Sequence, residues 1–220
     1  MLAAHRGEVF VMLSAIGIVD LHDRRTRDWH HCAGQKVDTV AASDGERSDW
    51  LSLVSRQHRA NFELWHIEDE ARTPGASERE LAEVKRRVDS TNQRRNDLSE
   101  QLDQALLAWL DDRSLPRPEA PLHSESPGLI IDRLSILALK IYHTREEACR
   151  LDAPPGHEER NLDRLAILTE QRADLAHCLD TLWAETLAGK RRFKLYRQLK
   201  MYNDPSLNPA VYRRLVKEQD

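Results

Sequence analysis

The sequence predicts an all-α protein, a long-helix bundle with a four-helix core, an N-terminal helix and a basic C-terminal helical segment. Two observations predict this class. Glycine and proline are scarce, with 8 and 9 among 220 residues, and the stretches between them are rich in helix-favouring Leu, Ala, Glu, Arg and Gln. In addition, apolar residues recur at three- and four-residue steps over long segments. We expect one helical domain over residues 1–220, with residues 1–17 as an N-terminal extension.

The composition excludes several classes of protein. The formal net charge of −4 speaks against a nucleic-acid binder, which carries a basic excess. Cys32, Cys149 and Cys178 are odd in number and form no CxxC motif, so neither a disulfide framework nor a zinc ribbon is expected. The apolar run from Val9 to Val19 is too short to span a bilayer and lacks a small-residue cleavage site. A cytoplasmic location without a membrane span fits best.

The first expected helix runs from Glu8 to about His31 and ends in a polar stretch around Trp29. That stretch holds side chains of types that bind metals: Asp20, His22, Asp23, His30 and His31. No pair among them shows a clean two-turn ligand spacing with a carboxylate base. We therefore favour a solvated helix end with a packed tryptophan over a metal site. Residues 32–48 are short of large apolar side chains and are expected to form a loop.

The second helix is expected over residues 48–72. Ser48 or Asp49 can cap it, and the Thr-Pro-Gly sequence that follows stops it. Polar and aromatic side chains recur along one face at steps of three and four residues: His58, Asn61, Trp65, Asp69 and Arg72. Because these side chains point the same way, the row is a candidate partner for charges on another helix.

The third helix, residues 77–113, opens with a capping box formed by Ser77 and Glu80. Its apolar stripe runs to Val88 and resumes at Leu98. The positions between them hold amides and charges: Asn92, Arg95, Asn96 and Asp97. A stripe interrupted in this way indicates a buried polar network or a wet cleft. The alternative is that the helix projects into solvent there.

A proline-rich linker over residues 114–127 is expected to cross to the helix at 128–150, around which the bundle is organised. Between residues 129 and 142 that helix is apolar on every side, so it should be central. Asp132, Lys140 and His143 nevertheless lie on it at helical spacing. Because a buried charge needs a partner, other helices should supply one, and the candidates are Arg72, Arg95, Arg172 and Asp69.

The last long helix, residues 158–188, carries leucines at near-heptad steps, which is typical of a structural helix. Residues 190–200 are strongly basic with interleaved Phe193, Leu195, Tyr196 and Leu199, and we expect a helical segment across one end of the bundle. Such a segment can hold a phosphate. An ordinary helix whose cations extend into solvent is the favoured interpretation.

Few catalytic motifs are present. Glu63 and His66 form a Glu-x-x-His sequence, which a di-iron carboxylate bundle carries on two helices, but the second copy is missing. We therefore expect no metal and no cofactor. Neither a Gly-x-Ser-x-Gly sequence nor a glycine-rich phosphate loop occurs. The remaining polar side chains on apolar faces are mostly Asn, Arg and Lys, which suit a polyhydroxylated or phosphorylated ligand, with His or Asp as general base.

Four ordered strings resemble the bacterial domain-of-unknown-function 4254 family. They are ANFELWHIEDEAR at 60–72, KRRVDSTNQRRNDLSEQLD at 85–103, GLIIDRLSILALKIYH at 128–143 and KMYNDPSLNPAVY at 200–212. The resemblance begins at about residue 18 and implies a helical protein. It also implies a role beside glycosyltransferases of heptosyltransferase type, in the synthesis of envelope glycans or glycosylated natural products. No biochemical activity is settled for the family.

The residues and the resemblance together lead to one hypothesis, nucleotide-sugar-dependent glycosyl transfer, as a catalyst or as an obligate partner of a glycosyltransferase. The expected ligand is a sugar nucleotide or another phosphorylated polar small molecule, and a homodimer is left open. The candidate catalytic residues are His66, Asp69, Asp132 and His143. The candidate ligand-binding residues are Trp65, Arg72, Asn92, Arg95, Asn96, Lys140, Lys200, Tyr202 and Asn203. A metal-dependent helical-bundle enzyme and a non-catalytic structural or interaction module are the alternatives.

Overall fold

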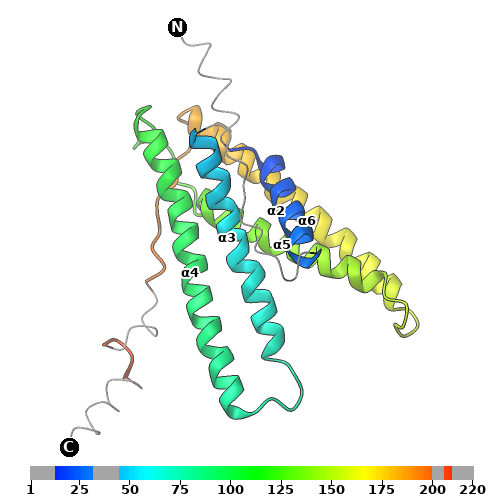
Figure 1. Ribbon diagram of the computed structural model, residues 1–220. Coiled ribbons are helices and arrows are strands. Elements are labelled where there is room, and N and C mark those ends of the chain that lie inside the picture. The colour runs from blue at the N-terminus through cyan, green and yellow to red at the C-terminus, as the bar shows by residue number, and fades with distance from the viewer. Residues whose placement is uncertain (1–12, 32–44, 200–205, 210–220) are drawn as a thin grey trace, which may run out of the picture.

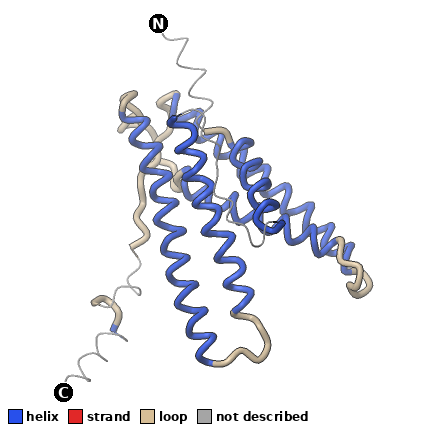
Figure 2. Tube along the Cα trace, viewed as in Figure 1, coloured by secondary structure: helices blue, strands red, loops and turns tan. Residues whose placement is uncertain are grey.

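The protein is all-α, as predicted. The structure is a computed structural model that describes residues 13–31, 45–199 and 206–209. Five long helices account for most of these residues: α2 (Ala15–His31), α3 (Gly45–Glu70), α4 (Glu78–Asp111), α5 (Pro127–Ala148) and α6 (His157–Leu187). Within the described ranges no strand is present (Figure 2), and none of these helices has an apolar run long enough to cross a membrane.

The helices form two long hairpins that diverge from a common end (Figure 1). Helix α3 pairs with α4, and α5 pairs with α6; these are the two most extensive contacts between elements. Helix α2 lies against the second hairpin and also touches α3. Helix α5 contacts each of the other four helices, which confirms that the segment with apolar side chains on every side is the central one.

The hydrophobic core lies where the two hairpins meet. Its fully buried side chains come mainly from the second half of α4, the first half of α5 and the last part of α6: Leu102, Leu106, Leu110, Ile130, Ile131, Leu134 and Leu179. Leu81, near the start of α4, is 42% exposed. The first turn of α4 therefore extends beyond the core, whereas Val84, about one turn further along, is already buried.

Helix starts follow the local sequence signals in one case and depart from them in another. The capping box that begins α4 is confirmed, because the Ser77 backbone N–H donates to Glu80 Oε2 at 2.7 Å and the Glu80 N–H donates to Ser77 Oγ at 3.3 Å. The cap expected at Ser48 or Asp49 is wrong, since α3 already begins at Gly45. A polar residue that can cap a helix is also tolerated inside its first turn.

The start of α5 is tied closely to α4. Asp103 accepts hydrogen bonds from the Ser126 hydroxyl at 2.5 Å and from the Gly128 N–H at 2.7 Å. A Cβ atom at position 128 would lie 2.4 Å from the carbonyl oxygen of Ser99, so this approach requires glycine. Burial raises the pKa of Asp103 to about 6, although both hydrogen bonds favour the ionised form.

The helix expected in the basic C-terminal segment is wrong for residues 190–199, which are extended. Gly189 follows the last turn of α6 in the left-handed backbone conformation, with φ +68°, and the chain changes direction there. The Arg192 N–H then donates to Pro121 O at 3.0 Å, and the His123 N–H donates to Arg192 O at 2.7 Å. These bonds to the proline-rich linker replace helical ones, and the segment runs beside α4, where the Gln198 N–H donates to Glu100 at 2.7 Å (Figure 1).

Candidate functional site

A buried polar network occupies the centre of the molecule around Asp132 on α5. Its carboxylate accepts hydrogen bonds from Gln57 Nε2 at 2.5 Å, from Asn61 Nδ2 at 2.9 Å and from Arg95 Nε at 2.8 Å, and a second guanidinium nitrogen of Arg95 forms an ion pair with its other oxygen. Asn92 accepts a further bond from Arg95 at 3.3 Å. Arg95 is therefore the partner that the buried charge needed.

The network continues from Asp132 towards α2 through a chain of hydrogen bonds. Asn61 donates to the Ser135 hydroxyl at 2.9 Å, and Ser135 lies 2.7 Å from Nδ1 of His58. Nε2 of His58 lies 3.1 Å from the carbonyl oxygen of His22. Since a carbonyl oxygen only accepts, Nε2 carries the proton and Nδ1 accepts from Ser135. Burial lowers the pKa of His58 to about 3, so its ring is neutral.

The Asp132 carboxylate is fully engaged within this network, and that limits what it can do. Asp132 is 6% exposed, and both of its oxygens are bonded. A catalytic acid or base must reach a proton on a substrate. We therefore assign Asp132 to holding α3, α4 and α5 together and remove it from the candidate catalytic residues.

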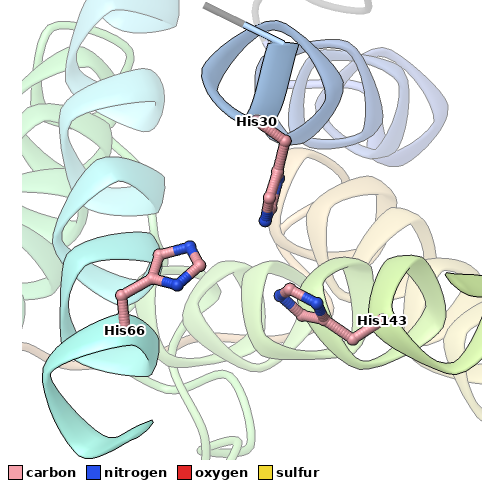
Figure 3. Close-up of side chains that lie close together, drawn as sticks. All are labelled: His30, His66 and His143. Carbon is pink, nitrogen blue, oxygen red and sulfur yellow. The ribbon is translucent and has the colours of Figure 1, made fainter. Parts of the chain in front are cut away.

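A second polar group, the three-histidine cluster, is formed by residues of α2, α3 and α5. His30 comes from the last turn of α2, His66 from near the end of α3 and His143 from α5, and their rings point toward a common space (Figure 3). One ring nitrogen of each lies within 4.8 Å of one nitrogen of both others. The ring centroids are 5.0 to 5.9 Å apart, and the ring planes cross at 66 to 83°.

Aromatic rings surround the three-histidine cluster and fix its orientation. Trp65 stacks on His143 with centroids 4.8 Å apart and planes at 9°. Tyr142 stacks on His30 at 4.3 Å and 19°. Phe62 contacts the edge of His66 at 4.5 Å. These contacts restrict ring rotation, so the cluster is a rigid arrangement of imidazoles.

The electrostatics of the cluster favour neutral rings. Burial is the largest cause that lowers the pKa of His66 and of His143, and repulsion from His30 adds to it. Asp69 acts in the opposite direction on both rings, and Glu146 raises the pKa of His143 through a hydrogen bond. Neutral imidazoles can act as general bases or as metal ligands.

A groove of about 310 Å³ adjoins the cluster between α3, α4 and α5. Aromatic, acidic and guanidinium side chains line it together with aliphatic ones: Trp65, Asp69, Arg72, Arg95, Ile136 and Leu139. Asp69 and Arg72 are exposed at its edge, where Arg72 forms a 3.1 Å ion pair with Glu68. Arg95 borders both this groove and the buried network.

A comparison with known protein families identifies the family of this chain. Residues 51–195 match the model of the family described as "Protein of unknown function (DUF4254)", which is more than half of the 220 residues. The chain belongs to the DUF4254 family. No curated protein and no solved structure matches it. The matched region of the DUF4254 family contains His66, His143 and the ion pair of Asp132 with Arg95, whereas His30 lies before it.

The structure brings together part of the predicted site of this DUF4254 protein. Trp65, His66, Asp69, Arg72 and His143 meet at the cluster and its groove. Asn92 and Arg95 belong to the buried network, and Asn96 is half-buried on the same helix. The candidate residues Lys200, Tyr202 and Asn203 lie outside the described residues.

Lys140 departs from the prediction that it shares a site with Asp132 and His143. It is exposed and borders a different groove, between α5 and α6, together with Gln171 and Asp174. Although positions 132, 136 and 140 are spaced at single turns, a lysine is long and well hydrated, so its ammonium extends to water instead of entering the network.

Three further results concern residues that are not among the candidate site residues. His30 was set aside because no second ligand follows it at helical spacing, but its neighbours in space come from two other helices. Glu63, the acid of the Glu-x-x-His sequence, does not join the cluster. It pairs with Arg59 at 3.0 Å and with Arg94. Gln57 and Ser135 gave no sequence signal beyond being polar on otherwise apolar helices.

Proposed function

We propose that this DUF4254 protein acts in nucleotide-sugar-dependent glycosyl transfer, as the catalyst or as an obligate partner of a glycosyltransferase, in the synthesis of bacterial glycans or glycosylated natural products. The observation that carries the proposal is the groove beside Trp65, where an indole ring, a carboxylate and two guanidinium groups surround about 310 Å³. Pockets of roughly 300 Å³ and more hold small polar ligands.

The groove offers the groups that a sugar phosphate needs. An indole ring presents an apolar face to the C–H groups of a sugar ring. The Asp69 carboxylate accepts hydrogen bonds from sugar hydroxyls, and Arg72 is placed at the edge to bond a phosphate in bidentate fashion. Arg95, already paired with Asp132, gives a fixed positive charge beside them.

The neutral imidazoles of the cluster supply the base that glycosyl transfer requires. His66, whose ring is only half-buried, takes the proton from an acceptor hydroxyl. The oxygen then attacks the anomeric carbon of the donor sugar, and the nucleoside diphosphate leaves with the bonding electron pair. The guanidinium of Arg72 compensates the charge that develops on the phosphate.

A cytoplasmic location forms part of the same proposal. Cys149 and Cys178 are exposed, free thiols, and such thiols persist in reducing compartments.

Binding of sugar nucleotides tests the proposal. We expect ligand-detected NMR and calorimetry with a panel of sugar nucleotides to detect binding, by the protein alone or with a candidate glycosyltransferase. Trp65→Ala and Arg72→Ala should weaken it by about tenfold or more, because stacking and a charge-assisted bond are lost. Arg86→Ala is the matched control, since Arg86 is exposed on α4 away from the groove. Absence of binding by both preparations would refute the proposal.

A further inference from the structure

Two nitrogens of the three-histidine cluster lack hydrogen-bond partners. Nε2 of His30 and Nε2 of His143 are buried, and neither finds a partner among the described residues. The opposite nitrogen of each ring is engaged: Nδ1 of His30 lies 2.7 Å from the carbonyl oxygen of Thr26, and Nδ1 of His143 lies 2.9 Å from Glu146 Oε2. Since these oxygens accept, each Nδ1 carries the proton. Each ring, in its neutral form, therefore has its lone pair on Nε2.

The three rings surround a common space, to which each offers one nitrogen as a possible ligand atom (Figure 3). Buried acceptors are normally satisfied, so a donor or a cation is expected between them. The three nitrogens lie within 4.8 Å of one another. Bonds of about 2.0 Å to a tetrahedral ion need nitrogen separations of about 3.4 Å, so shifts of about 1 Å per ring complete the geometry.

We propose that His30, His66 and His143 form a binding site for one divalent transition-metal ion of the zinc class. Imidazole nitrogens suit Zn²⁺, Cu²⁺, Fe²⁺ and Ni²⁺, whereas Mg²⁺ and Ca²⁺ require oxygen ligands. An ion held by three protein nitrogens keeps a further position for water or a substrate atom. The inference goes beyond the proposed function and does not rest on it, because it concerns metal binding alone. A ring nitrogen that binds an ion cannot also accept a proton, so with the ion bound a water held by the ion would replace the imidazole as the base of the proposed transfer.

The groups that accept hydrogen bonds from these histidines are of the kind found around the histidine ligands of metal sites. A ligating histidine usually donates its second N–H to a carboxylate or to a backbone carbonyl, which fixes the tautomer. Glu146 fills that place for His143, and the carbonyl of Thr26 fills it for His30. Asp69 and Glu146 also supply negative charge near a divalent ion. Without the ion, the alternative is three histidines held by aromatic packing and by these two hydrogen bonds.

The cluster can be reached from solvent. His66 borders a groove of about 580 Å³ between α3 and α4. Trp65, which stacks on His143, borders the 310 Å³ groove on the neighbouring side. An ion at the cluster would therefore have an entry path.

Metal titration of protein made without a histidine tag tests the inference. After treatment with a chelator, the protein is titrated with Zn²⁺ by calorimetry and with Co²⁺ by visible absorption. We expect one ion per chain and the strong visible bands of cobalt in a site of low coordination number. His66→Ala, which removes a half-exposed ligand, should weaken binding at least about 100-fold, more than the 10–100-fold effect of outer-shell changes.

Two further variants test whether zinc binds at the three-histidine cluster and not elsewhere on the protein. Glu146→Gln should weaken zinc binding about tenfold, because it removes the carboxylate that orients His143. His177→Ala, at an exposed position on α6, should leave affinity unchanged. Circular dichroism confirms that each variant is folded, and His66→Gln replaces His66→Ala if the latter is not.

Two outcomes would overturn the inference. The first is wild-type protein that takes up well below one zinc ion per chain. The second is zinc binding that the substitution at His66 does not change, since the ion would then lie elsewhere. Both outcomes are distinct from failure of the proposed function, which is measured by sugar-nucleotide binding.

Discussion

The buried network and the three-histidine cluster are two polar layers that share three helices, and α4 adds Arg95 to the first of them. Helices α2, α3 and α5 supply His22, His58 and Ser135 to the first layer, and His30, His66 and His143 to the second. On each of these helices the residue of the second layer follows that of the first by eight positions, about 12 Å along the helix. In the inner layer both oxygens of Asp132 are bonded, although the Gln57 carbonyl oxygen and the His22 ring nitrogens find no partner among the described residues. In the outer layer, Nε2 of His30 and Nε2 of His143 likewise find no partner there, and one nitrogen of each of its three rings lies within 4.8 Å of the others. This convergence of three possible ligand atoms distinguishes the outer layer as a candidate site.

The largest expected effect breaks the inner layer. Asp132→Ala should destabilise the protein by about 3–5 kcal/mol, because it leaves Arg95 and two amides without their acceptor. Chemical denaturation measures this change in the free energy of unfolding. Asp69→Ala is the matched control at the outer layer, where the exposed carboxylate should contribute within about 0.5 kcal/mol. Equal losses for both variants would contradict the division into two layers.

The next effect is on pH dependence, through His58. Burial lowers its pKa to about 3 in the folded protein, below the usual 6.5, so the unfolded chain binds the proton more readily. Its contribution is present above pH 6.5 and is lost as the pH falls towards 3, by about 1.4 kcal/mol per pH unit. His58→Gln should make the loss of stability between pH 6.5 and 5 shallower, measured by denaturation at several pH values. His177→Gln, at an exposed site, should not.

A smaller effect separates the geometry of an ion pair from its charge. Arg95→Lys keeps the positive charge but loses the paired contact to both oxygens of Asp132, so we expect a loss of about 1–2 kcal/mol. Arg94→Lys changes the neighbouring, exposed pair with Glu63 and should cost less than about 0.5 kcal/mol. Denaturation midpoints compare the two variants, and a larger loss at Arg94 would reverse the comparison.

The smallest expected effect is at the outer layer. In metal-free protein, His66→Ala should change the free energy of unfolding by less than about 1 kcal/mol, because a half-exposed ring is removed. Added zinc should raise the melting temperature of the wild type and leave that of the variant unchanged, since only binding to the folded state stabilises it. Differential scanning calorimetry measures both quantities.

The sequence was sufficient for much of this architecture. The helix periodicity, the capping box at Ser77 and the charge partners Asp132 and Arg95 follow from local rules and from the cost of burying charge. His30 could not be found in the same way, because its role depends on proximity to residues 36 and 113 positions later. The extended basic segment was missed because its backbone hydrogen bonds go to the distant residues 121 and 123.

Packing at Gly128 influences the residues of both layers that lie on α5. Because Gly128 has no Cβ, the first turn of α5 packs directly against the Ser99 carbonyl. This contact fixes the position of that end of the helix. His143 stands fifteen residues further along, about 22 Å from that point, where a tilt of about 5° moves a side chain by roughly 2 Å. A single methyl group at position 128 would thus displace the His143 imidazole more than the nearby Asp132. The position of that ring relative to His30 and His66 therefore depends on packing at the far end of α5.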